Sequence, residues 1–440
     1  MMRTTAITAL VIAALVIMPV ADADERWEAL SKEAHSRLDA SPAWGEADAE
    51  LVEEMLADGL SREEAVQIAL MSNSSLQAAF DRLGIARADL QQAGLYSNPA
   101  IETVILWPDE HDAEIEIEAT WNLADLWRVP VRKRGARAEA DRVTMIVLAE
   151  LLNTAADARM AWDAAIATAD VTTEAAAVLE AAEDLLARMQ ERLDYGFGEQ
   201  LDIERVKAEV AEAEVQLAMA EAEQATALSR LRRILGLPSE ASLSPEGDLP
   251  TAPAAMPSGD DLIAVALAER PEVHAADLGA RAADLDLRLQ RRSAWQHVEL
   301  GPAYTREPEG EELWGFVLGV DLPINDNNRA QRRRAEAELR QAEDRARAAR
   351  SMVVEEVEVA REHLALAARR EALLRETVIP AREQAHQFAQ THYMQMELSM
   401  LPVIETRREL ASARRMHVEA RRQVAEALVE LEFAVGGRLP

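Results

Sequence analysis

The chain of 440 residues contains no cysteine, and this absence excludes disulfides, thiolate metal sites and a lipid-modified N-terminal cysteine. Aromatic residues are also scarce, at 4% of the sequence. Alanine, glutamate, arginine and leucine dominate instead, a composition typical of long packed helices rather than of ordinary globular cores. Beyond the apolar N-terminal segment, no uninterrupted apolar run is nearly as long as a membrane-spanning helix requires, which is about 18 residues.

Basic residues are few in comparison with acidic ones: 47 Lys and Arg residues stand against 79 Asp and Glu residues, a net charge of −32. A charge of this sign disfavours nucleic acid and anionic lipid headgroups as partners, and it would draw cations towards any enclosed acidic surface. No Gly-rich phosphate loop, zinc-ligand spacing or Ser/His/Asp grouping occurs in the sequence, so we expect neither an enzyme nor a bound cofactor.

Residues 1–23 have the pattern of an export signal. Arg3 precedes an apolar run, and Ala21-Asp22-Ala23 supplies the small residues of a cleavage site. We therefore expect a mature protein that starts near Asp24 and leaves the cytoplasm. If this protein enters a membrane, it must do so through a β-barrel, because no later segment could span as a helix.

The most informative pattern is a duplication. Residues 60–236 and 260–440 each contain a short helical stretch, two strand-like runs, a very long helix and a second long helix that returns. An N-terminal helical segment, 24–59, precedes the first copy, and a proline-rich connector, 237–259, separates the two copies. Such an internal repeat predicts a pseudo-symmetric fold that is mainly α-helical with a small β part.

The helical signal within each copy is long. We expect four helices with alanine-rich apolar seams that pack as antiparallel, coiled-coil-like pairs, over about 131–193, 200–236, 328–391 and 398–436. The first copy opens with a helix from Ser61 to about Gln92, and Glu64 completes a capping box with Ser61. Before it, the segment 25–58 has the pattern of one short amphipathic helix.

Two segments alternate between apolar and polar side chains, which predicts β-hairpins at about 98–122 and 297–323. In the first hairpin, isoleucines share one face and carboxylates share the other, those of Glu114, Glu116 and Glu118. Four strands with exposed edges do not form a stable sheet alone, so they need strands from other chains. Such a ribbon suits a barrel wall with lipid outside and water inside. The alternative is a pair of hairpins that pack their apolar faces on the helical bundle.

Several stretches resemble the TolC-like outer membrane factor family, over essentially the whole mature chain. The resemblance is carried by the order and spacing of five stretches: the Ala-Leu openings at 69–73 and 266–270, Ala-Gly-Leu-Tyr-Ser-Asn-Pro at 93–99, Leu-Arg-Arg-Ile-Leu-Gly-Leu-Pro at 231–238, and Tyr393 with the segment 397–406. It implies a homotrimer in which each chain gives four strands to one twelve-stranded transmembrane β-barrel. The long helices would continue that barrel into the periplasm as a hollow α-helical barrel.

The resemblance also implies a function and a location. The protein would be an outer membrane channel with a periplasmic extension, the exit duct of a tripartite efflux pump that conducts small molecules or metal ions passively. Its implied partners are a periplasmic adaptor (membrane fusion) protein, an inner-membrane transporter of the RND type and outer membrane lipid. Two alternatives remain open: the exit channel of a type I protein secretion system, and a soluble periplasmic coiled-coil scaffold.

In this family the tunnel narrows where the long helices turn back. The resemblance implies that Tyr393, Glu405 and Asp202 border the periplasmic aperture, although Pro402 stands where a second acidic residue is usual. It likewise implies that two residues lie at the tips that contact the adaptor, namely Gly198 and Met396.

The second turn carries soft ligand atoms. His392, Met394, Met396 and Met400 lie close together in sequence, and thioether and imidazole groups suit Cu(I) or Ag(I). A metal contact at this turn is therefore one hypothesis. The alternative is that these methionines provide adaptable packing against a partner.

Basic residues cluster directly after each hairpin. The members are Arg128, Arg132, Lys133, Arg134 and Arg137 after the first, and Arg329, Arg332, Arg333 and Arg334 after the second. They could anchor the protein at the headgroup boundary below a barrel. Equally, they could form intramolecular ion pairs along the long helices.

Overall fold

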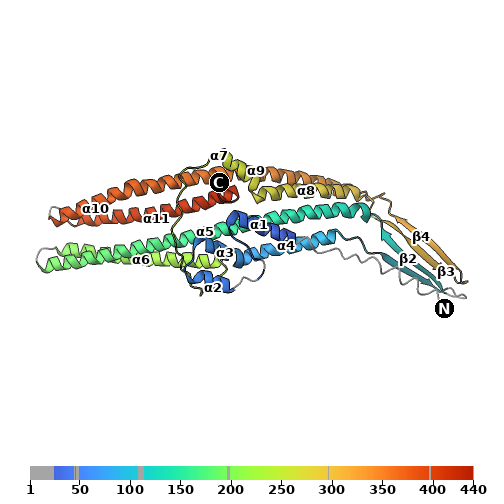
Figure 1. The fold of residues 1–440 in the computed structure, drawn as a ribbon, viewed down its shortest axis with the longest axis horizontal. Helices are drawn as coiled ribbons and strands as arrows, with labels where there is room; N and C mark the ends of the chain where they lie inside the picture. The colour runs from blue at the N-terminus through green and yellow to red at the C-terminus, as the bar shows by residue number, and fades with distance from the viewer. Residues whose placement is uncertain are drawn as a thin grey trace.

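The computed structural model describes residues 24–43, 45, 49–107, 113–195, 199–295, 297–395 and 398–439. The molecule is elongated: two antiparallel helical hairpins form one end, a β-sheet forms the other, and short helices surround the middle (Figure 1). Among the described residues, no helix has both the length and the hydrophobicity of a transmembrane helix. The export signal expected over 1–23 lies outside the described residues.

Four short helices precede the first hairpin: α1 (Asp24–Leu38), α2 (Ala49–Ala57), α3 (Arg62–Ser72) and α4 (Ser74–Ala93). The predicted capping box is confirmed, because Ser61 and Glu64 each accept a hydrogen bond from the backbone amide of the other. The expectation of one helix across α3 and α4 is wrong, because Asn73 divides it. The Asn73 backbone is extended, and its side-chain oxygen accepts from the amides of Ser75 and Leu76, which starts α4.

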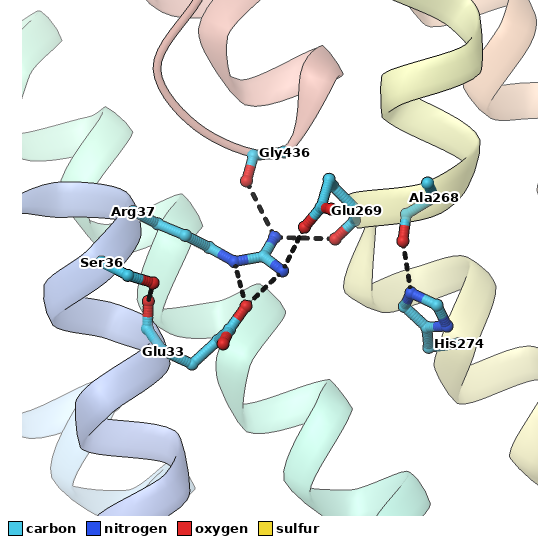
Figure 2. A network of polar contacts seen from close by, with 7 residues as sticks. All are labelled: Glu33, Ser36, Arg37, Ala268, Glu269, His274 and Gly436. Carbon is cyan, nitrogen blue, oxygen red and sulfur yellow. Dashed lines mark hydrogen bonds and ion pairs between the residues drawn. The ribbon is translucent and has the colours of Figure 1, made fainter.

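The segment 25–58, expected as one helix, contains two. The helix α1 stops before Asp39, which has a left-handed backbone (φ 57°) that a helix does not continue through. Figure 2 shows how Arg37 of α1 joins distant parts of the chain. Its guanidinium donates to the backbone oxygens of Glu269 (2.7 Å) and Gly436 (2.9 Å) and pairs with the Glu269 carboxylate (2.9 Å). The N-terminal helix is thereby fixed to the second half of the chain.

Long helices make up most of the molecule. They are α5 (Asp125–Asp194), α6 (Gln200–Ile234), α9 (Arg329–Leu373), α10 (Ile379–Met394) and α11 (Leu401–Val435). The continuous helix expected over 328–391 needs one correction, because a π-helical turn, η1 (Leu374–Val378), separates α9 from α10. Pro380 is the second residue of α10; it lacks a backbone N–H, and its ring would clash with a carbonyl of the preceding turn. The wider turn lets the helical path continue past the proline.

Two further helices, α7 (Gly259–Glu269) and α8 (Pro271–Arg292), hold in the second half the positions that α3 and α4 hold in the first. In each half, the residue between the two short helices binds the end of the return helix. Asn73 donates to the carbonyl of Ile234 (2.8 Å), and Arg270 donates to that of Ala434 (3.2 Å). Gly236 follows α6 with φ 70°, and a Cβ there would collide with the backbone at the end of α3, so the close approach requires glycine.

The helices pack side by side. In the half nearer the sheet the order is α4, α5, α8 and α9, and in the other half it is α6, α5, α11 and α10 (Figure 1). The helix α5 therefore has neighbours from its own chain on both sides, whereas α4, α6, α9 and α10 form the outer edges. The largest apolar core lies at the middle, where Trp162 of α5 is fully buried and donates to the carbonyl of Leu60 (2.8 Å).

The two predicted hairpins are confirmed and join into one antiparallel sheet. Its order is β1-β2-β3-β4, with β1 (Ala100–Leu106), β2 (Glu114–Asn122), β3 (Val298–Arg306) and β4 (Glu312–Val320). The sequence did not reveal the pairing of β2 with β3, which brings the two halves of the chain together. Gly301 permits a close approach there, because a Cβ would collide with the carbonyl of Ala119. The sheet extends away from the helices, so the alternative of hairpins packed on the bundle is wrong (Figure 1).

Candidate functional site

One face of the sheet is apolar and solvent-exposed. The strand register places these side chains on the same face: Ile101, Ile105, Ile115, Ile117, Trp121, Leu300, Tyr304, Trp314, Phe316, Leu318 and Val320. Phe316 is 85% exposed and Leu318 is 67% exposed, with no helix covering them. A contiguous apolar surface of this extent marks an interaction site, and its shape is that of a ribbon.

The opposite face of the sheet is acidic. The same register gives it five carboxylates, those of Glu102, Glu114, Glu116, Glu118 and Glu299. Glu102 and Glu118 lie directly opposite each other on neighbouring strands. Like charges in this arrangement are unfavourable unless water or cations screen them, so this face requires an aqueous environment.

Tryptophan and tyrosine gather at the two ends of the sheet. The chain has 8 Trp and 4 Tyr residues, and seven of these twelve lie in or beside the sheet: Tyr96, Trp107, Trp121, Trp127, Trp295, Tyr304 and Trp314. Tyr304 and Trp314 form one pair, with ring centroids 4.9 Å apart. These amphipathic rings are enriched where a membrane meets water.

The far ends of the helical hairpins form a second candidate region, in which Tyr393 has a central place. Its hydroxyl donates to the sulfur of Met189 (3.0 Å), and the Arg192 guanidinium lies 5.1 Å from its ring centroid. Burial raises the pKa of the Tyr393 phenol above its ordinary value, against the opposing effect of Arg192, and nearby Asp202 adds to the rise. The structure therefore brings Tyr393 and Asp202 into one electrostatic environment.

The other residues expected at the aperture differ in exposure. Asp202, in the first turn of α6, is partly covered and pairs with Arg205 at 3.4 Å. Glu405, in the first turns of α11, is exposed and has no hydrogen bond or ion pair with any residue that the structure describes. Gly198 and Met396, expected at the tips, lie outside the described residues.

The soft ligands of the second turn have different surroundings. Met400 is fully buried in a core that α5, α6, α10 and α11 share, with Met189, Ile203 and Val403 among its members. Met394 is 73% exposed. The ring of His392 contacts that of Phe388 in a tilted arrangement, with centroids 4.0 Å apart. Met400 therefore packs within the core of its own chain, and the structure tests neither the metal contact nor packing against a partner.

A row of arginines on α11 was not singled out from the sequence. Pairs recur at every seventh residue, at 407–408, 414–415 and 421–422, and this periodicity was the available signal. Arg407 donates to the carbonyl of Val178 on α5 (3.0 Å), and Arg408 pairs with Glu212 on α6 (2.6 Å). Further along, Arg421 pairs with Asp170 at 3.4 Å. These contacts hold the hairpin α10–α11 against the hairpin α5–α6.

Two titratable groups at this seam are shifted by their surroundings. Burial lowers the pKa of the Arg407 guanidinium, and the carboxylate of Glu209 opposes that effect. Burial also lowers the pKa of the His386 imidazole, and the positive charges of Arg407 and Arg414 lower it further. The Nδ1 atom of His386 lies 3.1 Å from the hydroxyl of Thr406, a hydrogen bond that joins α10 to α11.

Comparisons with known proteins agree with this geometry. Residues 262–437 match the family described as outer membrane efflux protein. The cobalt-zinc-cadmium resistance protein CzcC of Cupriavidus metallidurans is 24% identical over 391 residues, which cover 86% of this chain and 91% of that protein. The outer-membrane channel OprN has the same fold, with a TM-score of 0.73 and 20% identity over 90% of this chain and 94% of its own. CusC also has this fold, with a TM-score of 0.73 and 16% identity over 86% of this chain and 92% of its own. Residues 262–437 thus match the outer membrane efflux protein family, and the chain has the fold of outer-membrane channels over about nine tenths of its length.

Proposed function

We propose that the protein is the exit duct of a tripartite efflux pump, located in the outer membrane with a periplasmic extension. The observation that carries the proposal is the two-faced sheet, with an exposed apolar surface on one side and carboxylates on the other. A sheet of this kind is stable where lipid covers the first face and water the second. Its strands have seven to nine residues, and the longer ones reach the lower end of the range of about 9–11 residues that a tilted transmembrane strand needs.

Three chains close the channel in this proposal. The outer strands β1 and β4 each have one edge without a partner among the described strands, and such edges pair with further strands. The helical edges also differ from each other, so copies would join head to tail and form a ring. The exposed side of α9 supports this, because apolar residues recur there at every seventh position: Met352, Val359, Leu366 and Leu373. The repeated halves give each chain two similar hairpin units of the barrel and tunnel.

The proposed cargo is a divalent metal cation, and the proposed partners are a periplasmic adaptor and an inner-membrane transporter of the RND type. The named metals of the relative CzcC, cobalt, zinc and cadmium, support the cargo. The acidic face of the sheet and the net charge of −32 are compatible with a path that cations traverse. In this proposal the cations pass through the channel passively, because the inner-membrane transporter supplies the energy for transport.

Growth tests of a deletion strain examine this function. We expect the strain to become more sensitive to cobalt, zinc or cadmium than its parent, and the intact gene to restore tolerance. The same plates should include copper, silver, dyes and antibiotics, to distinguish a metal duct from a drug duct. Unchanged tolerance to every compound, together with the loss of a secreted polypeptide, would instead identify a type I secretion channel.

We further propose that Tyr393, Asp202 and Glu405 border the periplasmic aperture. Replacing Tyr393 by alanine removes the contact with Met189 and the stacking of Arg192, so we expect a several-fold rise in single-channel conductance across a planar bilayer.

Replacing Glu405 by glutamine should lower the preference of the channel for cations over anions, because the Glu405 carboxylate is exposed and unpaired among the described residues.

Glu204→Gln provides the matched control for these measurements. Glu204 is an exposed acid of α6, and its carboxylate is already engaged by Lys207 at 2.9 Å. Its replacement should leave both conductance and ion preference near those of the parent. A channel in which Tyr393→Ala and Glu405→Gln behave like this control has its constriction elsewhere.

A further inference from the structure

The charge of the chain is reversed where the helices meet the sheet. Three segments flank that junction: 126–137 at the start of α5, 287–295 at the end of α8 and just after it, and 327–335 at the start of α9 (Figure 1). Together they contain twelve Lys and Arg residues and no Asp or Glu, in a chain whose net charge is −32. The overall charge that disfavours anionic partners therefore does not describe this zone.

Some of these cations are satisfied within the chain. Arg132 donates to the carbonyl of Ala93 (2.8 Å), and Arg292 donates to that of Trp127 (3.1 Å). The Asp125 carboxylate accepts a hydrogen bond from the amide of Ser97 (2.7 Å) and lies near the arginines of the first turns of α5, so it neutralises part of the cluster. Arg288 and Arg334 pair with acidic residues one turn away.

Five cations of the zone remain exposed and form no hydrogen bond or ion pair with any part of the chain that the structure describes. They are Lys133, Arg134 and Arg137 on α5, and Arg329 and Arg333 on α9. We call the three residues on α5 the collar. Because α4 and α8 flank α5 on both sides, a neighbouring copy in the proposed trimer cannot cover this exposed face.

The collar continues an apolar stripe. The exposed residues Leu126, Pro130, Lys133 and Arg137 recur at three- and four-residue spacing, so they lie on one face of α5. Leu126 stands just after the apolar strand β2, and Lys133 follows about 10 Å further along the helix axis. That separation matches the distance from the edge of the hydrocarbon region of a bilayer to its headgroups. The phosphates of the headgroups then lie within reach of a long basic side chain.

We infer that the collar binds anionic phospholipid headgroups in the membrane leaflet from which the helices emerge. The inference rests on the proposed membrane position of the sheet. Arginine donates two parallel hydrogen bonds to phosphate oxygens, and lysine adds a point charge. A lipid is favoured over free phosphate because its acyl chains also cover the exposed apolar side chains beside the collar, those of Tyr96, Trp121 and Leu126.

The test measures headgroup preference of the purified full chain by native mass spectrometry, with phosphatidylglycerol and phosphatidylcholine in competition. We expect the parent to retain phosphatidylglycerol preferentially. The variant Lys133→Gln, Arg134→Gln, Arg137→Gln should lose this preference by about tenfold or more, given the strength of attraction between each basic residue and an anionic surface. The charge-conserving variant Lys133→Arg, Arg134→Lys, Arg137→Lys should keep it. Inorganic phosphate should not displace the lipid.

The matched control removes three positive charges far from the sheet, with Arg188, Arg230 and Arg369 each replaced by glutamine. An equal loss in this control would reduce the effect to net charge and overturn the inference. The inference also fails if the collar variant keeps its lipid preference and changes only the ion preference of the conductance, because the collar would then face the lumen. Insertion of the parent into bilayers that contain both phosphatidylcholine and phosphatidylglycerol separates the two proposals: insertion without headgroup preference overturns the collar alone, and no insertion overturns both.

Discussion

Replacing Phe316 and Leu318 by arginine should abolish assembly of the protein in the outer membrane. Both side chains lie on the exposed apolar face of β4. An arginine on the lipid face of a barrel costs about 2–4 kcal/mol near the middle of the bilayer, and each of three chains would carry two of them. The measurement is the amount of heat-resistant oligomer in the outer membrane fraction, compared with that of the parent.

The neighbouring position gives a sharp control. Val317 lies between the two substituted residues, but its side chain belongs to the opposite, acidic face. Arginine at this position would face water and carboxylates, so Val317→Arg should assemble at close to the parent level. If Val317→Arg fails as completely as the double variant, the two faces of the sheet do not have the environments that we propose. Normal assembly of the double variant would have the same consequence.

Asp163→Ala should lower the free energy of unfolding by about 3–5 kcal/mol, because it leaves a partly buried arginine without its partner. The Asp163 carboxylate is fully buried in α5, and Arg62 of α3 binds both of its oxygens at 2.9 Å. This pair sits beside the buried Trp162, in the core that joins the short helices to α5. Denaturant-induced unfolding of the purified protein, followed by tryptophan fluorescence, measures the loss.

Two further variants separate loss of the pair from loss of a charge. Asp344 also forms an ion pair with an arginine, Arg347, but both side chains are exposed, so Asp344→Ala should cost no more than about 1 kcal/mol. The double variant Arg62→Met, Asp163→Leu replaces the buried pair by apolar groups and should recover much of the stability. A double variant as unstable as Asp163→Ala would contradict the assigned cause.

The elements with strong local signals were predictable. The capping box at Ser61 and Glu64 starts α3, and the alternating pattern around Glu114–Glu118 forms β2. The break at Asn73 was missed because helix-forming residues lie on both sides of it, and only the contact with Ile234 shows why the chain turns there. The turn η1 was missed because a proline can either end a helix or be accommodated within one, and the residues around Pro380 do not show which occurs.

In the candidate sites, too, some features were predictable from the sequence and others depended on contacts between distant segments. The sequence indicated that the glutamates of β2 share one face, because side chains alternate along any strand. It could not show that Glu299 joins them, since that depends on the pairing of β2 with β3 across the two halves of the chain. At the other end, Tyr393 was expected at the aperture, but its contact with Met189 spans more than two hundred residues and leaves no local trace.

By itself, the sequence determined the types of the elements, the two-faced character of the strands and the resemblance to one family, because helix and strand periodicities and end signals are local properties of the chain. Only the tertiary structure decided which helices flank α5, and hence that Lys133, Arg134 and Arg137 are exposed, whereas Arg132 is bonded to Ala93. It also decided how arginines of α11 join the two hairpins. These features arise from contacts between segments distant in sequence, and packing, not periodicity, selects such contacts.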